Sequence, residues 1–280
     1  MKLIKKIADW KTEVLAIERP YGLVPTIGAL HDGHLALIRR GRKENSTLIA
    51  SIFVNPKQFG PNEDFDHYPK NTELDLNKLE KEGVDFVFLP SPDEMYPIGF
   101  ATHIDPGRLA ARLEGSHRDG HFRGVATVVT KLFSIFSPDV AYFGQKDFQQ
   151  SLLIKNIALD LNLDVEIVVE STVRDGDGLA LSSRNQYLSN KEQIAARVLY
   201  KSLSVAERVY KDGILSSDII RNEVIEIIKA EPIAKIDYVS VCDVKTLIDI
   251  ETIDRPAIVL VAARFGRTRL IHTIYLNCFN

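Results

Sequence analysis

Two histidines flank a glycine in the stretch His31-Asp32-Gly33-His34. Residues 21–24 before it are apolar enough for a buried strand, and residues 35–43 after it have the spacing of an amphipathic helix. The free N–H groups and positive dipole end of a helix favour an anion there, and Gly28 and Gly33 would let the backbone turn sharply beside it. Imidazoles at that point can donate hydrogen bonds to phosphoryl oxygens and stabilise developing charge. The stretch therefore predicts a phosphate-binding turn.

The histidine pair could also have one of two different roles. His31 and His34 could be neighbours on a helix surface, or they could be two ligands of a zinc ion. Against zinc, the chain has no Cys-x-x-Cys motif, and the nearest other pair, His117 and His121, lies far along the sequence.

A second polar cluster follows residues 47–54, an apolar run typical of a strand buried on both faces of a parallel sheet. The run ends in a loop rich in turn residues that contains Asn55 and Gln58. Ligands of open α/β sheets collect beyond the carboxyl ends of the strands, so we expect both side chains at the same edge as the histidine turn. The alternative is that Gln58 is an ordinary loop amide.

A third cluster, residues 144–147, follows a short predicted strand at 139–143 and precedes a helix that runs to about residue 160. Lys146 could neutralise phosphate charge as a mobile cation. Gln150 could orient a hydroxyl or a carboxylate through its amide. Lys146 could also be a solvated surface lysine, but its place at the carboxyl end of a strand favours a role in binding.

Residues 118–124 bring Arg118 and His121 to the start of an apolar helix at 125–136. Such a helix start could hold a second anion, and a solvated capping turn is the alternative.

The segment at 174–178 is charged and contains two glycines, so it is predicted as a flexible linker with a domain boundary between residues 174 and 175. Ser182, Ser183 and Arg184 follow it and offer donors that suit phosphate oxygens. A mobile loop with these residues could close on a nucleotide.

The remaining pattern predicts an α/β domain with a parallel sheet, followed by a smaller α+β domain. Leu74, Leu76 and Leu79 have helical spacing in a predicted helix at 72–82, and strands are expected at 84–89 and 164–169. Prolines and glycines divide residues 90–120 into loops and short pieces. In the smaller domain, the expected helices are 190–211 and 217–230, and the expected strands are 236–241, 257–263 and 269–275.

Composition limits the classes of function. The 280 residues include 45% hydrophobic residues, which is ordinary for a globular chain of about two domains. A formal charge of −3 and a pI near 6.2 argue against a nucleic-acid partner. Cys242 and Cys278 give no disulfide framework. No apolar run reaches membrane-spanning length, and lysines interrupt the N-terminus where a signal peptide needs an apolar region, so we expect a cytoplasmic protein without a membrane partner.

Taken together, the chain resembles the pantothenate synthetases, the pantoate–β-alanine ligases of the HxGH nucleotidyltransferase superfamily. The resemblance extends from residue 23 to residue 276 through several long motifs in the same order. They are VPTIGALHDGH, SIFVNPKQFGPNEDFDHYP, LEGSHRDGHFRGVATVVTKLF, AYFGQKDFQQ, DGLALSSRNQYL and AIVLVAARFGRTRLI. Three positions depart from the usual pattern: Ile27 replaces Met, Gln145 replaces Glu and Asp119 replaces Pro.

The resemblance implies a Rossmann-like domain at 1–174 that binds ATP and pantoate, and a C-terminal domain at 175–280 that closes over the nucleotide. It implies ATP-dependent condensation of (R)-pantoate with β-alanine through a pantoyl-adenylate, with Mg²⁺ and a homodimeric assembly. The implied catalytic residues are His34, His31, Lys146 and Arg184. The implied ATP contacts are Ile27, Gly28, Ala29, Leu30, His31, Asp32, Gly33, His34, Gly144, Gln145, Lys146, Asp147, Val173, Leu181, Ser182, Ser183 and Arg184. Gln58 would bind both pantoate and β-alanine, and Gln150 would bind pantoate.

Two rival functions remain at the level of sequence. A nucleotidyltransferase would stop at adenylylation and release a nucleotide product, whereas Gln58 and Gln150 provide for an acid and its hydroxyl group. A regulatory nucleotide-binding module would show no turnover, because a fold and a motif do not guarantee chemistry.

Overall fold

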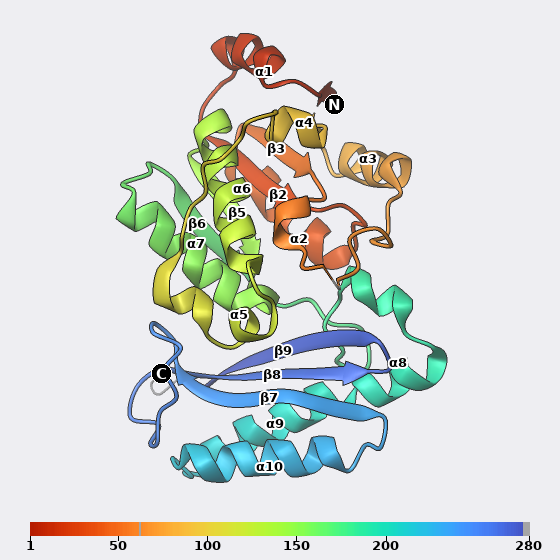
Figure 1. The fold of residues 1–280 in the computed structure, drawn as a ribbon, viewed down its shortest axis with the longest axis vertical. Coiled ribbons are helices and arrows are strands. Elements are labelled where there is room, and N and C mark those ends of the chain that lie inside the picture. The colour runs from red at the N-terminus through yellow and green to blue at the C-terminus, as the bar shows by residue number, and fades with distance from the viewer. Residues whose placement is uncertain (62, 277–280) are drawn as a thin grey trace. The chain divides into compact units, whose positions relative to one another are not determined.

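The structure, a computed structural model, describes residues 1–61 and 63–276. The chain forms two compact units (Figure 1). The first contains residues 1–145 and 149–171, and the second contains residues 146–148 and those from 172 onward. Cys278 lies outside the described residues.

In the described part of the first unit, six parallel strands form a sheet in the order β1-β4-β3-β2-β5-β6. Their bounds are β1 Lys2–Ile4, β2 Tyr21–Thr26, β3 Thr47–Ile52, β4 Phe86–Phe88, β5 Val140–Gly144 and β6 Glu166–Glu170. The helices are α1 Ile7–Glu13, α2 Asp32–Glu44, α3 Thr72–Lys81, α4 Pro92–Met95, α5 Glu114–His117, α6 His121–Phe136 and α7 Phe148–Asp160.

Neighbouring residues of the central strands pack on opposite faces of this sheet. Leu23 and Ile49 join a cluster with α6, α7 and Trp10 of α1, whereas Val24 and Leu48 join another with α2 and α3. Neighbouring residues join different clusters because adjacent side chains of a strand point to opposite faces of the sheet, and helices cover both faces. The continuous apolar runs in the sequence follow from this double burial.

The second unit places two helices on one face of an antiparallel sheet (Figure 1). Its elements are α8 Asn190–Ala196, α9 Val198–Lys211, α10 Ser217–Lys229, β7 Ala234–Asp243, β8 Ala257–Phe265 and β9 Thr268–Leu276. Leu199 and Leu203 of α9 and Val224 of α10 pack with Val259 and Val261 of β8. The predicted α/β domain and smaller α+β domain are therefore confirmed.

Some local predictions differ from the structure. The apolar helix begins at His121 rather than at 125, and the sequence pattern missed β1 and α1. In α3, Leu74 is 47% exposed, whereas the carboxylate-bearing Asp75 is 2% exposed. The predicted apolar stripe is thus wrong at Leu74. The carboxylate of Asp75 is buried in its place, because it accepts hydrogen bonds from backbone N–H groups inside the unit.

The segment predicted as a flexible linker is a hydrogen-bonded turn. The Oδ1 of Asp175 accepts from the N–H groups of Asp177 and Leu179 at 3.0 and 2.9 Å, and the guanidinium of Arg174 donates to the carbonyl oxygen of Gly178 at 3.2 Å. Arg174 also lies 4.7 Å above the ring of Tyr200. Arg174 and Asp175, two of the charged residues that suggested a flexible linker, instead bond to backbone groups of the turn.

No helix within the described residues is long and apolar enough to cross a membrane.

Truncation of one aromatic ring should test the core of the first unit. Phe136 is 1% exposed, and its ring centroid lies 4.8 Å from that of Trp10 and 5.2 Å from that of Phe88. Phe136→Ala should lower the free energy of unfolding by about 3–5 kcal/mol, because it removes buried area and leaves a cavity. Trp10 is the single tryptophan of the chain, so its fluorescence during denaturant unfolding reports on this unit. The matched control is Leu15→Ala at an 87% exposed position, and equal midpoints for the two variants would contradict the prediction.

Candidate active site

Three neighbouring strands deliver polar turns to one edge of the parallel sheet. β2 lies between β3 and β5, and all three run in the same direction. Residues 27–34 follow β2, residues 55–58 follow β3, and Gly144 and Gln145 lie at the end of β5. The carboxyl edge of such a sheet is where ligands of α/β folds bind. The topology thus brings the histidine turn to the same edge as Asn55 and Gln58 and as the first two residues of the cluster at 144–147.

The two histidines cap α2. The Nδ1 of His31 accepts a hydrogen bond from the Gly33 N–H at 3.1 Å, and the Nδ1 of His34 accepts a longer one from the His31 N–H at 3.4 Å. The ring centroids are 4.1 Å apart. Because both Nδ1 atoms accept, the ring protons lie on the Nε2 atoms, which become donors. Gly33 belongs to the first helical turn and has no positive φ, so its expected role in a sharp turn is wrong.

Asp75 of α3 fixes the turn before the histidines, and the sequence reasoning missed it. Its two carboxylate oxygens accept from the N–H groups of Ala29 and Leu30, each at 2.8 Å. Gly28 and Ala29 both have a positive φ, of 84° and 52°. A Cβ on Gly28 would also meet the Oδ2 of Asp75 at 3.3 Å, so glycine suits this position. The four-residue spacing of Asp75 and Leu79 on α3 was the available signal, since it places a carboxylate on the apolar face.

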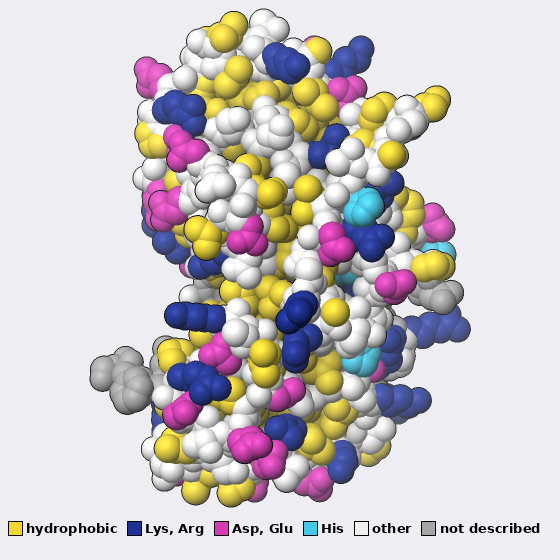
Figure 2. All heavy atoms as spheres, turned by 60° about the vertical axis from the view of Figure 1, so that its left-hand side comes forward, with side chains coloured by type: hydrophobic (Ala, Val, Ile, Leu, Met, Phe, Trp, Pro, Cys, Tyr) yellow, Lys and Arg dark blue, Asp and Glu magenta, His cyan; other side chains and the backbone are white. Residues whose placement is uncertain are grey.

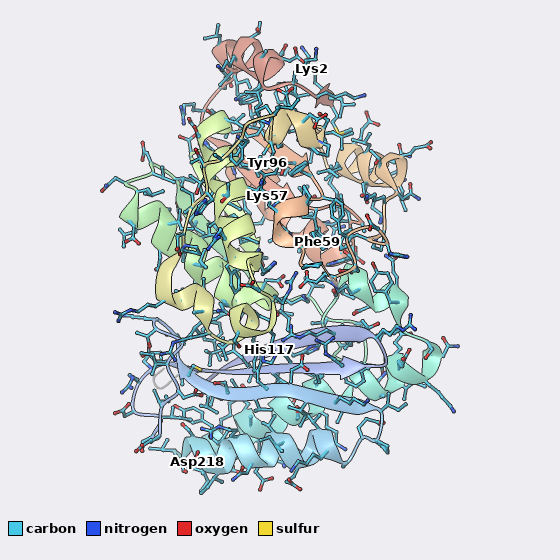
Figure 3. All side chains as sticks on the ribbon, viewed as in Figure 1. Lys2, Lys57, Phe59, Tyr96, His117 and Asp218 are labelled. Carbon is cyan, nitrogen blue, oxygen red and sulfur yellow. The ribbon has the colours of Figure 1, made fainter. Side chains whose placement is uncertain are left out.

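Gln58 is 8% exposed and lies in a short 3-10 turn, Pro56–Gln58, which three residues separate from the end of β3. The side-chain Nδ2 of Asn55 donates to the Oε1 of Gln58 at 3.2 Å. The Oδ1 of Asn55 accepts from the Tyr96 hydroxyl at 2.8 Å and from the Lys57 N–H at 3.2 Å, and the ammonium of Lys57 lies 5.0 Å from the Tyr96 ring centroid (Figure 3). Gln58 is thus a fixed, buried amide.

After β5, the carbonyl oxygen of Gly144 accepts from the Ser151 hydroxyl at 3.1 Å. The ammonium of Lys146 lies 3.5 Å from a carboxylate oxygen of Asp147, and its side chain is 20% exposed. Gln150 lies in the first turn of α7 and is half-buried. Its neighbour Gln149, 2% exposed, donates to two carbonyl oxygens of residues 109–112 and so holds that segment.

In the second unit, the predicted nucleotide residues lie on both sides of the turn at 174–178. The N–H of Leu181 donates to the carbonyl oxygen of Val173 at 3.0 Å. The N–H of Ala180 donates to the Nε2 of His272 on β9 at 2.9 Å. Burial, and secondly the charge of Arg174, lower the pKa of His272 to about 3, so the neutral ring can accept this bond.

Ser182, Ser183 and Arg184 continue from this anchored backbone. The hydroxyl of Ser182 accepts from the Arg184 N–H at 3.3 Å and caps a 3-10 turn, Ser183–Tyr187. Ser183 is 5% exposed, and Ser182 and Arg184 are half-buried.

The cluster at 118–124 is a turn with Asp119 and Gly120 exposed to solvent, and its arginine and buried histidine bond to other protein groups. Arg118 donates to both carboxylate oxygens of Glu63 at 2.7 Å, so its charge is already paired. His121 is 7% exposed, and its Nδ1 lies 2.8 Å from the carbonyl oxygen of Gln58. His121 is therefore directed at the turn that carries Gln58, and Arg118 is directed at Glu63 and the His121 ring.

Within residues 1–61 and 63–276, no group of three or more His, Cys, Asp or Glu side chains is arranged to hold a metal ion. On the face shown in Figure 2, basic and acidic side chains are interspersed on each unit. This mixed surface agrees with the near-neutral formal charge.

Comparison with known proteins identifies the family. The profile described as pantoate-beta-alanine ligase matches residues 1–275. The pantothenate synthetase of Dehalococcoides mccartyi is 54% identical over 257 residues, which cover 92% of this chain and 96% of that protein. The solved pantothenate synthetase of Thermus thermophilus has a TM-score of 0.93 at 43% identity, with 98% of this chain and 99% of that chain covered. The Francisella tularensis pantoate-beta-alanine ligase, solved with beta-gamma ATP and beta-alanine, has a TM-score of 0.80 at 33% identity, with 98% and 97% covered. The chain therefore belongs to the pantoate–β-alanine ligases, enzymes that form an amide bond, as the sequence motifs indicated.

Proposed function

We propose that this ligase joins pantoate to β-alanine in two steps that consume ATP. In the first step, a carboxylate oxygen of pantoate attacks the α-phosphorus of ATP, which forms pantoyl-adenylate and expels pyrophosphate. In the second step, the amine of β-alanine attacks the acyl carbon, which gives pantothenate and AMP. The observation that carries this proposal is the capped histidine turn after β2, next to the buried amide of Gln58 after β3.

The histidine turn suits the first step because both imidazoles lie at the N-terminus of α2, where the helix dipole favours an anion. With Nδ1 occupied by backbone N–H groups, His31 and His34 present Nε2–H donors that can stabilise charge on the α-phosphate. Such a reaction depends on positioning and charge neutralisation more than on covalent catalysis. We assign His34 as the catalytic histidine and His31 as its assistant.

The remaining nucleotide contacts come from the segments described above. Lys146 and Arg184 supply positive charge for the phosphates. The proposed ATP-binding residues are Ile27 to His34, Gly144 to Asp147, Val173, and Leu181 to Arg184. The first domain, residues 1–174, would bind ATP and pantoate, and residues 175–280 would close over the nucleotide.

Gln58 and Gln150 are the proposed contacts for the acids. The Oε1 of Gln58 accepts from Asn55, so the amide N–H groups are the donors directed at an acid's oxygen atoms. Gln58 would contact both pantoate and β-alanine, and Gln150 would contact pantoate.

Mg²⁺ fits this site as an ion that would be coordinated mainly by the phosphate oxygens of ATP. The described residues contain no cluster of three potential ligands, and Mg²⁺ commonly binds through substrate phosphates with few protein carboxylates. When bound, it would neutralise charge on the phosphate oxygens. The protein's own part is then to hold the triphosphate through the backbone of the histidine turn and the side chains of Lys146, Ser182 and Arg184.

We also infer a homodimer in the cytoplasm. The family resemblance supports the dimer, and the two cysteines without a disulfide framework suit a reducing compartment.

Product analysis tests the proposed reaction. Mixed with ATP, Mg²⁺, pantoate and β-alanine, the protein should release equal amounts of pyrophosphate and AMP together with pantothenate. Omission of β-alanine should leave pyrophosphate formation limited to about one equivalent of enzyme-bound adenylate. Release of a free nucleotide product would favour a simple nucleotidyltransferase, and absence of turnover would favour a regulatory module.

His34→Ala should lose most of the adenylate-forming step while it remains folded. Removal of one preorganised donor typically costs about 3 kcal/mol of transition-state stabilisation, or roughly a hundredfold or more in rate. Pyrophosphate release in a single turnover measures this step. His103→Ala, at an exposed histidine outside the site, is the control, and near wild-type release by His34→Ala would refute the assignment.

Gln58→Ala should weaken pantoate far more than ATP, because it removes an amide from the acid site and leaves the histidine turn unchanged. The KM values for pantoate and ATP, each measured with the other substrates saturating, give the comparison. An unchanged pantoate KM with a raised ATP KM would place Gln58 in the nucleotide site instead.

ATP should order the loop that contains Arg184. Hydrogen exchange of residues 182–187 should slow when ATP and Mg²⁺ are added, because charge-assisted hydrogen bonds offset the lost loop entropy. Ala180 and Leu181 are the internal control, since their amides bond to residues outside the loop, to His272 and Val173. Arg184→Ala should lower activity, because it removes a guanidinium donor from the phosphates. Equal exchange at 182–187 with and without ATP would refute the closing loop.

A further inference from the structure

We propose that His121 is a positioning residue for Gln58, held in place by the ion pair of Glu63 and Arg118. Its imidazole fixes the backbone of the turn from which the Gln58 amide reaches the acid substrate. The inference rests on the proposed contact between Gln58 and pantoate.

The hydrogen bonds of the ring allow one neutral tautomer. The Nδ1 of His121 lies 2.8 Å from the carbonyl oxygen of Gln58, and its Nε2 lies 2.9 Å from a guanidinium nitrogen of Arg118. A carbonyl oxygen only accepts and a guanidinium only donates, so Nδ1 carries the proton and Nε2 accepts. His121 therefore donates to the peptide group of Gln58 itself.

Burial keeps the ring neutral. Desolvation, and secondly the charge of Arg118, lower the pKa of His121 to about 4. At neutral pH the Nε2 lone pair is thus available to Arg118. Both hydrogen bonds of the ring can then persist together.

Glu63 determines where the guanidinium lies. It accepts from the Nε and from one terminal nitrogen of Arg118, each at 2.7 Å, which leaves the other terminal nitrogen for His121. The side chains of Arg118 and Glu63 are only 14% and 21% exposed. A two-point pair of this kind fixes the plane of the guanidinium as well as its position.

The start of α6 is packed too closely against the Gln58 turn for the turn to shift independently. A Cβ on Gly124 would lie 2.1 Å from the carbonyl oxygen of Lys57 and 2.6 Å from the Cα of Gln58. The Nδ2 of Asn55 bonds both to the Gly124 carbonyl oxygen at 3.1 Å and to the Oε1 of Gln58 at 3.2 Å. The start of α6 is thus linked to Gln58 in two ways. His121 bonds to the backbone carbonyl oxygen of Gln58, and Gly124 is linked through Asn55 to its side-chain oxygen.

Substitution of His121 separates positioning from folding. His121→Phe keeps an aromatic ring but removes the donor, so the pantoate KM should rise about tenfold, the typical effect of one lost hydrogen bond, while the ATP KM stays unchanged. His121→Asn supplies an N–H group near the position of Nδ1 and should restore the pantoate KM to within about threefold of the original enzyme.

Thr127→Val on the same helix is the matched control. Thr127 is 4% exposed, accepts from the Ile104 N–H at 3.0 Å and donates to the Arg123 carbonyl oxygen at 2.7 Å, so its loss disturbs α6 without touching the Gln58 turn. It should lower the denaturation midpoint and leave the pantoate KM unchanged. Should His121→Phe fail to fold, Glu63→Gln tests the same series of hydrogen bonds, because it removes the charge that orients Arg118. This variant should raise the pantoate KM by about threefold.

The outcomes distinguish this inference from the function on which it rests. An unchanged pantoate KM in His121→Phe, or in Glu63→Gln if that variant is used, together with a raised one in Gln58→Ala, would overturn the positioning role and leave the acid site standing. An unchanged pantoate KM in Gln58→Ala would overturn both. Equal increases in the pantoate and ATP KM values, or an increase in Thr127→Val as large as in His121→Phe, would mean that His121 only stabilises the fold.

Discussion

The backbone at Gly28 and Ala29 must take a left-handed conformation for the chain to leave β2 and enter α2 with both histidines at the helix start. That conformation points two successive N–H groups into the interior, where an unpaired donor is costly. The carboxylate of Asp75 accepts both of them, each at 2.8 Å. The placement of the histidines therefore depends on a residue of another helix, 45 positions away in the sequence from Leu30.

Some polar side chains beside the proposed substrate contacts bond to backbone groups of the protein itself. Adjacent residues of α7 differ in this respect, since the buried Gln149 donates to the carbonyl oxygens of Leu109 and Arg112 while Gln150 is only half-buried. Arg118 and His121 likewise looked like anion ligands but bond to Glu63 and Gln58. A glycine-flanked cluster of donors is thus no guarantee of an external ligand.

Much of the fold was predictable from periodicity, because strands buried on both faces must be continuously apolar and their carboxyl ends must meet at one edge. This reasoning located β2, β3 and β5 and the turns that follow them. It failed where a buried polar side chain takes an apolar position, as Asp75 does beside the exposed Leu74. It also failed at 174–178. There Arg174 donates to a backbone carbonyl oxygen and Asp175 accepts from a backbone N–H group, and these partners come within reach only in the folded turn. Local pattern carries no information about distant partners such as Glu63, which lies 55 positions from Arg118.

The two buried histidines, His121 in the first unit and His272 in the second, couple folding to the proton concentration. Their pKa values of about 4 and about 3 lie below the ordinary value of 6.5. At a pH between the folded and the unfolded pKa values, the folded chain therefore binds fewer protons than the unfolded chain. Near pH 5, folding expels about one proton per histidine into the solvent, and acid opposes the folded state by mass action. Each of the two units thus carries its own acid-sensitive element, built from a ring that serves as a hydrogen-bond acceptor only while it is neutral.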